Sequence, residues 1–100
     1  MNKVKAFSYI GLGMKSGNVA CGEFLTEKAV KEKRAFLVIV AEDASQNTKK
    51  SFTNMCSYYS VPIYFIGSKD ELGHAMGKEM RASLAFLDQG LARAVEKQLL

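Results

Sequence analysis

The spacing of apolar residues alternates along the chain between helical and strand-like patterns. In helices the apolar positions recur every three to four residues, whereas buried strands form short continuous apolar runs. Glycine, proline and small polar residues interrupt both patterns and separate the elements. The pattern predicts helices at residues 3–16, at 23–33, from a cap at Asp43, Ser45 or Asn47 to just before Pro62, from Ser68 to near Gly77, and at 90–100, with strands at residues 18–21, 35–41, 63–66 and 82–87.

Residues 35–41 carry only apolar side chains, which is typical of a central strand that is covered on both faces. Ser68 and Glu71 have the spacing of a capping box, which predicts the start of the short fourth helix. Strict alternation of helices and strands predicts helices on both faces of the sheet. We therefore expect an α/β fold, a three-layer α/β/α sandwich with a four-stranded mixed, mainly parallel sheet, forming one domain over residues 1–100.

Composition excludes several classes of protein. With 48% hydrophobic and 24% charged residues and only one proline, the chain is neither collagen-like nor of low complexity. The apolar run 35–41 is far shorter than the roughly 20 residues that cross a bilayer. Polar residues and glycines interrupt the stretch after Lys3 and Lys5, so no export signal is visible. We expect a cytoplasmic protein with no membrane partner.

Positive charge is concentrated in the first third of the chain. Residues 1–34 hold seven basic and three acidic side chains, which accounts for the whole net charge of +4, because residues 35–100 hold seven of each. A one-sided positive field is typical of proteins that bind a polyanion, and a solvated basic face produces the same pattern. Charge alone leaves both alternatives open.

Residues that could support catalysis or bind a metal are scattered. Cys21 and Cys56 lie far apart and His74 is the only histidine, so neither a disulfide framework nor a zinc site is indicated. The glycines of residues 11–17 lack the spacing and the preceding strand of a nucleotide-binding loop. We expect a protein that is not an enzyme and has no cofactor and no metal.

Two helix starts suggest where an anion could bind. The second helix follows Gly22, whose missing Cβ lets a phosphate approach the free backbone N–H groups, and Lys28 lies about a turn and a half further on. Lys49 and Lys50 fall near the start of the third helix, where the helix dipole disfavours cations. Either an anionic partner or the acidic pair at 42–43 would offset that cost.

A set of ordered motifs resembles the superfamily of kink-turn-binding ribosomal proteins, which includes the archaeal box C/D core protein, and most closely its bacterial YlxQ-type members. The resemblance covers nearly the whole chain. Its motifs are Gly22 with Lys28-Ala29-Val30, the segment from Leu37 to Asp43, Asn47-Thr48-Lys49-Lys50, Cys56 with Val61-Pro62, the segment from Gly67 to Gly73, and Arg81-Ala82-Ser83.

The resemblance implies RNA binding by the start of the second helix and by the loop before the last strand. The helix motif of kink-turn binders reads Gly-x-Asn-Glu-x-x-Lys, and here Gly22 and Lys28 match while Phe24 and Leu25 replace the polar pair. An apolar pair cannot hydrogen-bond to base edges, which predicts loose sequence preference. The implied RNA-binding surface comprises Gly22, Glu23, Lys28, Met80, Arg81 and Ser83, with Lys15 and Asn18 at its edge and Lys49 and Lys50 as secondary basic candidates.

These observations predict a noncatalytic, monomeric bacterial protein that binds structured RNA in a ribosome or other ribonucleoprotein, with ribosomal or ribonucleoprotein proteins as further partners. Lysines and the start of the second helix would bind phosphates and supply most of the affinity. The alternative is a protein-interaction adaptor on the same fold, with Phe24 and Leu25 as an apolar contact patch. Exposure of Phe24 beside Leu25 would count against RNA recognition and favour the adaptor, whereas burial of Phe24 would remove the adaptor's main surface.

Overall fold

Helices and strands alternate through the computed structural model, which describes residues 1–100. The predicted order of nine elements is confirmed, and each element lies within a few residues of its expected position. Helices and strands occur in the order α1 (Lys3–Lys15), β1 (Val19–Cys21), α2 (Glu23–Lys31), β2 (Leu37–Val40), α3 (Gln46–Tyr59), β3 (Ile63–Phe65), α4 (Lys69–Ala75), β4 (Ser83–Phe86) and α5 (Gln89–Leu99).

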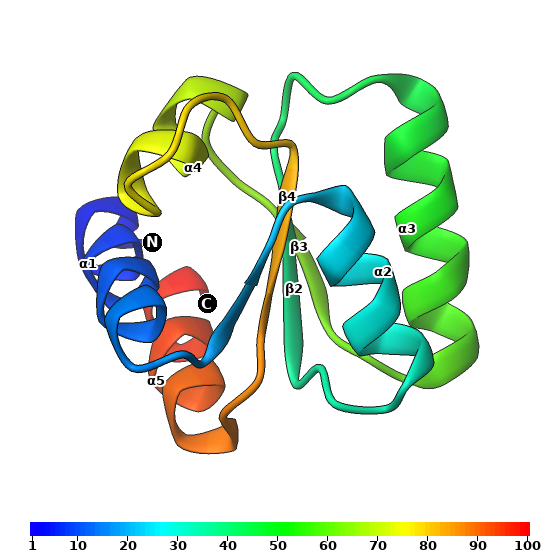
Figure 1. Ribbon diagram of the computed structural model, residues 1–100, viewed down its shortest axis with the longest axis horizontal. Helices are drawn as coiled ribbons and strands as arrows, with labels where there is room; N and C mark the ends of the chain where they lie inside the picture. The colour runs from blue at the N-terminus through cyan, green and yellow to red at the C-terminus, as the bar shows by residue number, and fades with distance from the viewer.

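The elements form the expected three layers (Figure 1). Helices α1, α4 and α5 cover one face of the sheet, and α2 and α3 cover the other. Strands β2 and β4 are buried along their whole lengths, because each lies between two other strands and under helices on both faces. The continuous apolar run 35–41 therefore marks a central strand, as its composition predicts.

The sheet is mixed, with the strand order β1-β4-β2-β3. Strands β2 and β3 are parallel, with Val38 opposite Ile63, whereas β4 is antiparallel to both β1 and β2. The expectation of a mainly parallel sheet is wrong, since two of the three pairings are antiparallel. The cause is the connection between β3 and β4.

This connection turns the chain at one end of the sheet. Helix α4 has only 7 residues and stays beside the end of the sheet where β3 finishes (Figure 1). The backbone N–H of Arg81 donates to the carbonyl of Lys69 at 3.1 Å, so the chain enters β4 close to where it entered α4. Gly73 allows this tight turn, because a Cβ there would collide with the carbonyl oxygen of Glu79. Strand β4 therefore runs back against β2.

The starts of the helices differ in one respect that bears on the site. Four helices have a side-chain cap, from Asn2, Ser45, Ser68 and Asp88, and Ser68 with Glu71 forms the predicted capping box. Helix α2 begins at Gly22 and has no side-chain cap. Its first backbone N–H groups therefore lack the partner that a capping side chain provides.

None of the five helices combines the length and the apolar character needed to cross a membrane.

Candidate nucleic-acid interface

Gly22 connects β1 to α2 in a backbone conformation that side-chain-bearing residues rarely adopt. Its φ is 91° and its ψ is 169°, a region used almost only by glycine. Its N–H donates to the carbonyl of Ser83 at 2.9 Å, which fixes the start of α2 against β4. The sequence needs glycine here for the turn itself, and the turn sets the direction in which α2 leaves the sheet.

The side chain of Arg81 lies over Gly22. A Cβ at Gly22 would be 3.5 Å from Cδ and 3.8 Å from Nε of Arg81. The guanidinium donates from Nη1 to the backbone carbonyl of Met80 at 2.9 Å, and Arg81 forms no salt bridge. The structure thus brings together the uncapped start of α2 and a guanidinium without a carboxylate partner. Both groups can donate hydrogen bonds to an anion.

Ser83 is not part of this surface, which corrects the prediction that it contacts RNA. It is 0% exposed, because β4 is covered on both faces. Its hydroxyl donates to Oγ1 of Thr26 at 3.3 Å, and Oγ1 of Thr26 donates to the carbonyl of Gly22 at 2.6 Å. Ser83 and Thr26 therefore hold the first turn of α2 in place and cannot touch a ligand.

Lys15 and Asn18 also lie outside this surface. Strand β1 separates them from Gly22 and runs from the end of α1 to the start of α2 (Figure 1). Four residues of extended chain span about 13 Å at ~3.3 Å per residue. The backbone carbonyl of Asn18 instead accepts from the N–H of Leu87 at 2.8 Å, near the start of α5. The prediction that these two residues form the edge of the surface fails, because nearness in sequence is lost along an extended strand.

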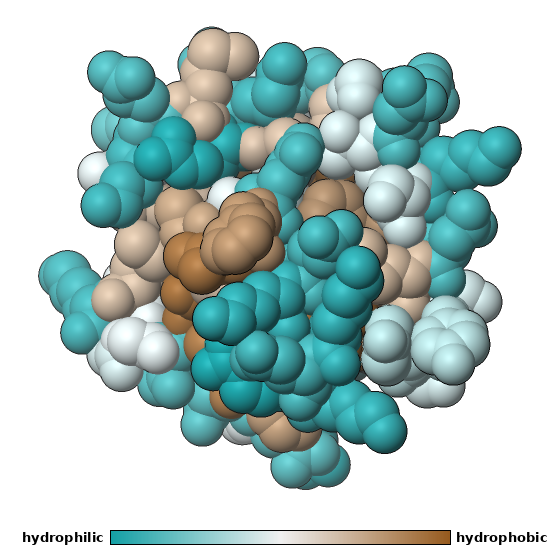
Figure 2. Space-filling model, turned by 45° about the vertical axis from the view of Figure 1, so that its right-hand side comes forward, coloured by the Kyte–Doolittle hydropathy of each residue, from teal (hydrophilic) through white to brown (hydrophobic).

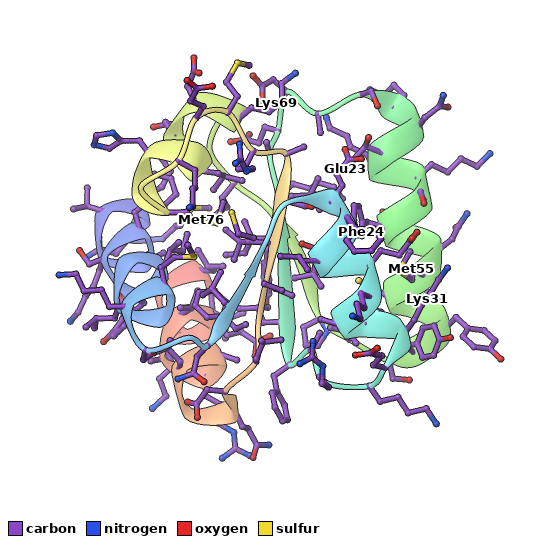
Figure 3. All side chains as sticks on the ribbon, in the orientation of Figure 1. Glu23, Phe24, Lys31, Met55, Lys69 and Met76 are labelled. Atoms are coloured by element: carbon purple, nitrogen blue, oxygen red, sulfur yellow. The ribbon has the colours of Figure 1, made fainter.

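Glu23 and Lys28 occupy different sides of α2. Oε1 of Glu23 accepts from the hydroxyl of Thr48 at 3.0 Å, so the starts of α2 and α3 are bound to each other. Figure 3 shows Glu23 at the upper end of α2, on the side of α3. Lys28 is exposed and has no ion pair. Lys28 is therefore free to meet a phosphate, while the Glu23 carboxylate is already partnered.

Lys49 and Lys50 lie in the first turns of α3, at the same end of the molecule as Gly22. Neither forms a salt bridge. The acidic pair makes backbone contacts nearby: Oε1 of Glu42 accepts from the N–H of Gly67 at 3.1 Å, and Oδ1 of Asp43 accepts from the N–H of Lys69 at 2.9 Å. These carboxylates keep their charge, and the Glu23 carboxylate also lies at the start of α3, so acidic neighbours and an anionic partner both remain as explanations.

Sequence reasoning overlooked Lys69, which joins this group of cations. It begins α4, its carbonyl accepts from the N–H of Arg81, and it forms no salt bridge. Figure 3 shows it at the upper edge of the molecule. A signal was available in the sequence, because the carboxyl ends of parallel strands meet at one edge, so the corners after β2 and β3 had to lie together.

We call this end of the molecule the amino-end surface. It comprises Gly22, Lys49, Lys50, Lys69, Met80 and Arg81, whereas Lys28 lies in the last turn of α2. It contains cations and free helix N–H groups, which bind phosphate oxygens. No group of three or more His, Cys, Asp or Glu side chains is placed to hold a metal ion.

Comparison with known proteins places this fold and surface in a family. The model of the ribosomal protein L7Ae/L30e/S12e/Gadd45 family matches residues 5–96. The chain belongs to this family. The RNA-binding protein YlxQ of Bacillus subtilis (strain 168) is 41% identical over 92 residues, covering 92% of each chain, which confirms the resemblance to YlxQ-type members.

Two solved structures extend the comparison. A protein with unknown function from Bacillus halodurans C has a TM-score of 0.92 and 31% identity over 97% of this chain and 98% of its own. The Giardia lamblia 15.5kD RNA binding protein has a TM-score of 0.83 and 25% identity over 96% of this chain and 86% of its own. The chain therefore shares its fold with both solved structures.

In this member of the L7Ae family, the apolar pair at the start of α2 is exposed. Phe24 is 75% exposed and Leu25 is 45% exposed. Phe24 also borders a groove of about 450 Å³ between α2 and α3, whose other lining residues are Glu23, Glu27, Asn47, Thr48, Ser51 and Phe52. Figure 2 shows apolar surface at the middle of this face, bordered by hydrophilic side chains. The apolar contact patch on which the adaptor alternative depends, Phe24 with Leu25, is therefore at the surface.

Proposed function

We propose that this protein is a noncatalytic RNA-binding protein whose amino-end surface binds the phosphates of structured RNA. Membership of the L7Ae family and similarity to two proteins described as RNA-binding support the proposal. The observation that carries it is the placement of Arg81 over Gly22, beside the only helix start without a side-chain cap. Three further lysines without ion pairs, Lys49, Lys50 and Lys69, lie at the same end.

In this mechanism, backbone and side chains act together on the phosphates. The uncapped N–H groups of α2 donate to one phosphate, and Arg81 binds the same or the next phosphate with its remaining donors. Phe24 and Leu25 offer no hydrogen bonds to base edges, so sequence preference is loose. We propose that the protein acts as a cytoplasmic monomer on ribosomal or other ribonucleoprotein RNA.

A salt titration tests the phosphate mechanism. A kink-turn RNA and an unrelated hairpin are titrated with the protein at several salt concentrations. Neutralising about three to five phosphates predicts that log affinity falls against log salt with a slope of roughly −3 to −4.5. A flat salt response would contradict the mechanism, and a strong preference for the kink-turn RNA would contradict the loose specificity.

Lys28→Ala provides a residue-level test in the same titration. Removing one phosphate contact should reduce the slope of log affinity against log salt by about 1 and weaken the binding of both RNAs equally. Lys97→Ala is the matched control, because Lys97 is an exposed lysine on α5, across the sheet from α2. Equal effects of the two substitutions would show that only net charge matters, and the assignment of Lys28 as a phosphate contact would fail.

The exposure of Phe24 favours the adaptor as a second candidate function. A ring beside the amino-end surface either stacks on RNA or meets a protein partner. Phe24→Ser separates the two, because it removes the ring without changing charge. Loss of RNA affinity assigns the ring to RNA, and unchanged RNA affinity favours the adaptor.

A further inference from the structure

A second cavity lies at the opposite ends of α2 and α3. It has a volume of about 700 Å³ and is lined by Val30, Lys31, Lys33, Ala35, Tyr58, Tyr59, Ser60 and Val61. Both helices run in the same direction from the amino-end surface, so their carboxyl ends meet here (Figure 1). The nine residues of α2 separate the two sites by about 14 Å, at 1.5 Å per residue. We call this cavity the carboxyl-end cavity.

Backbone strain is concentrated at this cavity. Lys33 and Ser60 have φ values of 61° and 59° and are the only residues other than glycine with a positive φ. Both follow the end of a helix, a position where glycine is common because it adopts this conformation without steric cost. A strained position that keeps its side chain points to a use for that side chain. Here both side chains line one cavity.

An aromatic pair stands beside these residues. The rings of Tyr58 and Tyr59 are 4.8 Å apart between centroids and inclined at 78°, so one stands edge-on to the other. Tyr59 is half-buried, whereas Tyr58 is 81% exposed. Tyr59 packs against the core and supports the Tyr58 ring, most of whose surface is open to solvent. Such a ring can stack on a nucleobase of any sequence.

The charged residues that line the cavity are all positive, namely Lys31 and Lys33. Lys33 forms no salt bridge, and Lys31 pairs only with Glu27 at 3.8 Å, on the surface. A surface ion pair of this kind is weak, so a phosphate can replace it. The helix dipoles disfavour anions at these ends, and the two lysines offset that effect. The groove near Phe24 differs, because it is lined by Glu23 and Glu27.

A path joins the two sites along α2. Phe24, Lys28 and Lys31 follow one another at spacings of four and three residues and share the outward side of the helix, opposite the buried Thr26 and Ala29. Figure 3 shows Phe24 near the upper end of α2 and Lys31 near its lower end. A stacked strand with about 3.4 Å per nucleotide covers the roughly 14 Å between the sites with about four nucleotides.

We propose that the carboxyl-end cavity binds an unpaired RNA segment that continues from the structured RNA held at the amino-end surface. One base of the segment stacks on Tyr58, and Lys31 and Lys33 bind its phosphates. The inference rests on the proposed function. It adds a preference for RNA that carries a single-stranded extension of about four nucleotides.

The test compares one hairpin RNA without and with a four-nucleotide unpaired extension, placed at either the 5′ or the 3′ end, against the full chain. We expect one of the two extensions to increase affinity at least about 5-fold, the lower end of what one stacked base contributes. Tyr58→Ala removes this gain, and Tyr58→Phe keeps it because the ring remains. Neither substitution changes the affinity for the hairpin alone.

Three other outcomes have different meanings. If the hairpin binds and neither extension adds affinity, the inference is overturned while the proposed function stands. If no RNA binds, the proposed function itself fails. If the gain survives in Tyr58→Ala, the extension binds elsewhere, and the cavity is not its site.

Lys33→Gly gives an independent readout. Glycine adopts a positive φ without strain, so the variant should melt at a higher temperature. It should also lose part of the affinity gained from the extension, because a cation is removed. Lys97→Ala again serves as the control for the loss of one positive charge. A Lys33→Gly protein that keeps the full gain would overturn the assignment of Lys33.

Discussion

The two ends of the α2–α3 layer use glycine in opposite ways. At the amino end, Gly22 stands where only glycine fits, with φ at 91° and the Arg81 side chain packed above it. At the carboxyl end, Lys33 and Ser60 stand where glycine would fit best. One end is relaxed because its residue suits the backbone, and the other holds strain because its residues do not.

The proposed binding of RNA at both ends relates this contrast to the helix dipole. At the amino end, the backbone itself attracts anions, so a glycine that exposes the N–H groups serves binding. At the carboxyl end, the backbone repels anions, so a side chain with a positive charge is needed there and glycine would remove it. The proposed phosphate contacts therefore account for Gly22 at one end and for Lys33 at the other, but they do not account for the uncharged Ser60.

Arg81→Ala should have the largest effect on RNA binding. The guanidinium is the only cation held directly over the start of α2, and a charge-assisted contact of this kind accounts for about a 10- to 100-fold change in affinity. Arg93→Ala is the control, since Arg93 is an exposed arginine on α5. Direct titration of hairpin RNA measures both. Equal losses in the two variants would show that only net charge matters and that Arg81 makes no specific contact.

Gly22→Ala should destabilise the fold by about 2 kcal/mol, because alanine at this φ and ψ is strained. Its Cβ would meet the Arg81 side chain only in ordinary van der Waals contact, so the cost comes from the backbone. Gly17→Ala is the comparison: φ there is 74°, and nothing lies within 4 Å of the added Cβ. Denaturant unfolding measures both changes. A loss at Gly22 no greater than at Gly17 would show that the backbone conformation at Gly22 is no more demanding than that at Gly17.

The periodic pattern of apolar residues predicted all nine elements. A helix with one buried face has apolar residues every three to four positions, and a fully buried strand has a continuous apolar run, so both can be recognised from local spacing. Strand direction was not predictable in that way. The direction of β4 depends on α4 being short and on Gly73 allowing the chain to turn back at one end of the sheet. Neither the length of a connection nor a close backbone approach has a periodic signature.

The candidate site was predictable only in part. The resemblance to a family pointed to Gly22 and Arg81, and the structure brings these two together. Ser83 is adjacent to the loop in sequence, yet it lies inside a strand covered on both faces. The strained Lys33 and Ser60 carry no signal, because sequence rules for this position look for glycine or asparagine.

Alkaline pH should loosen the carboxyl end through Cys56. Burial raises the pKa of its thiol from 9.0 to about 11, and its carbonyl accepts the N–H groups of Ser60 and Val61 that close α3. Below pH 9 the thiol is protonated in both states. As pH rises from 9 toward 11, only the unfolded chain ionises this group, so the folded state loses about 2 kcal/mol.

Urea unfolding at pH 8 and at pH 10.5 checks this expectation. Cys56→Ala supplies the control, because it removes the thiol while the other alkaline titrations remain. The variant is less stable at pH 8, since a buried group is deleted, but its further loss at pH 10.5 should be smaller than in the parent chain. An identical loss in both would mean that the thiol does not contribute.

The smallest expected effects are stabilising and lie at the carboxyl end. Lys33→Gly and Ser60→Gly should each raise the free energy of unfolding by about 0.5 to 1 kcal/mol, because relief of the left-handed strain exceeds the added flexibility of the unfolded chain. Lys28→Gly is the control of opposite sign: it lies inside α2, three residues before its end, where glycine costs about 1 kcal/mol. Thermal unfolding distinguishes the three variants.

The two glycine substitutions at the carboxyl end also separate strain that serves binding from strain that does not. Lys33 supplies a charge to the cavity, whereas Ser60 supplies only a hydroxyl. Ser60→Gly should therefore stabilise the fold with little effect on the affinity for the extended RNA. Lys33→Gly should stabilise the fold and lower that affinity. If both variants gain stability and neither loses affinity, the strain at this end does not serve RNA. The two ends of the α2–α3 layer would then differ in backbone conformation alone.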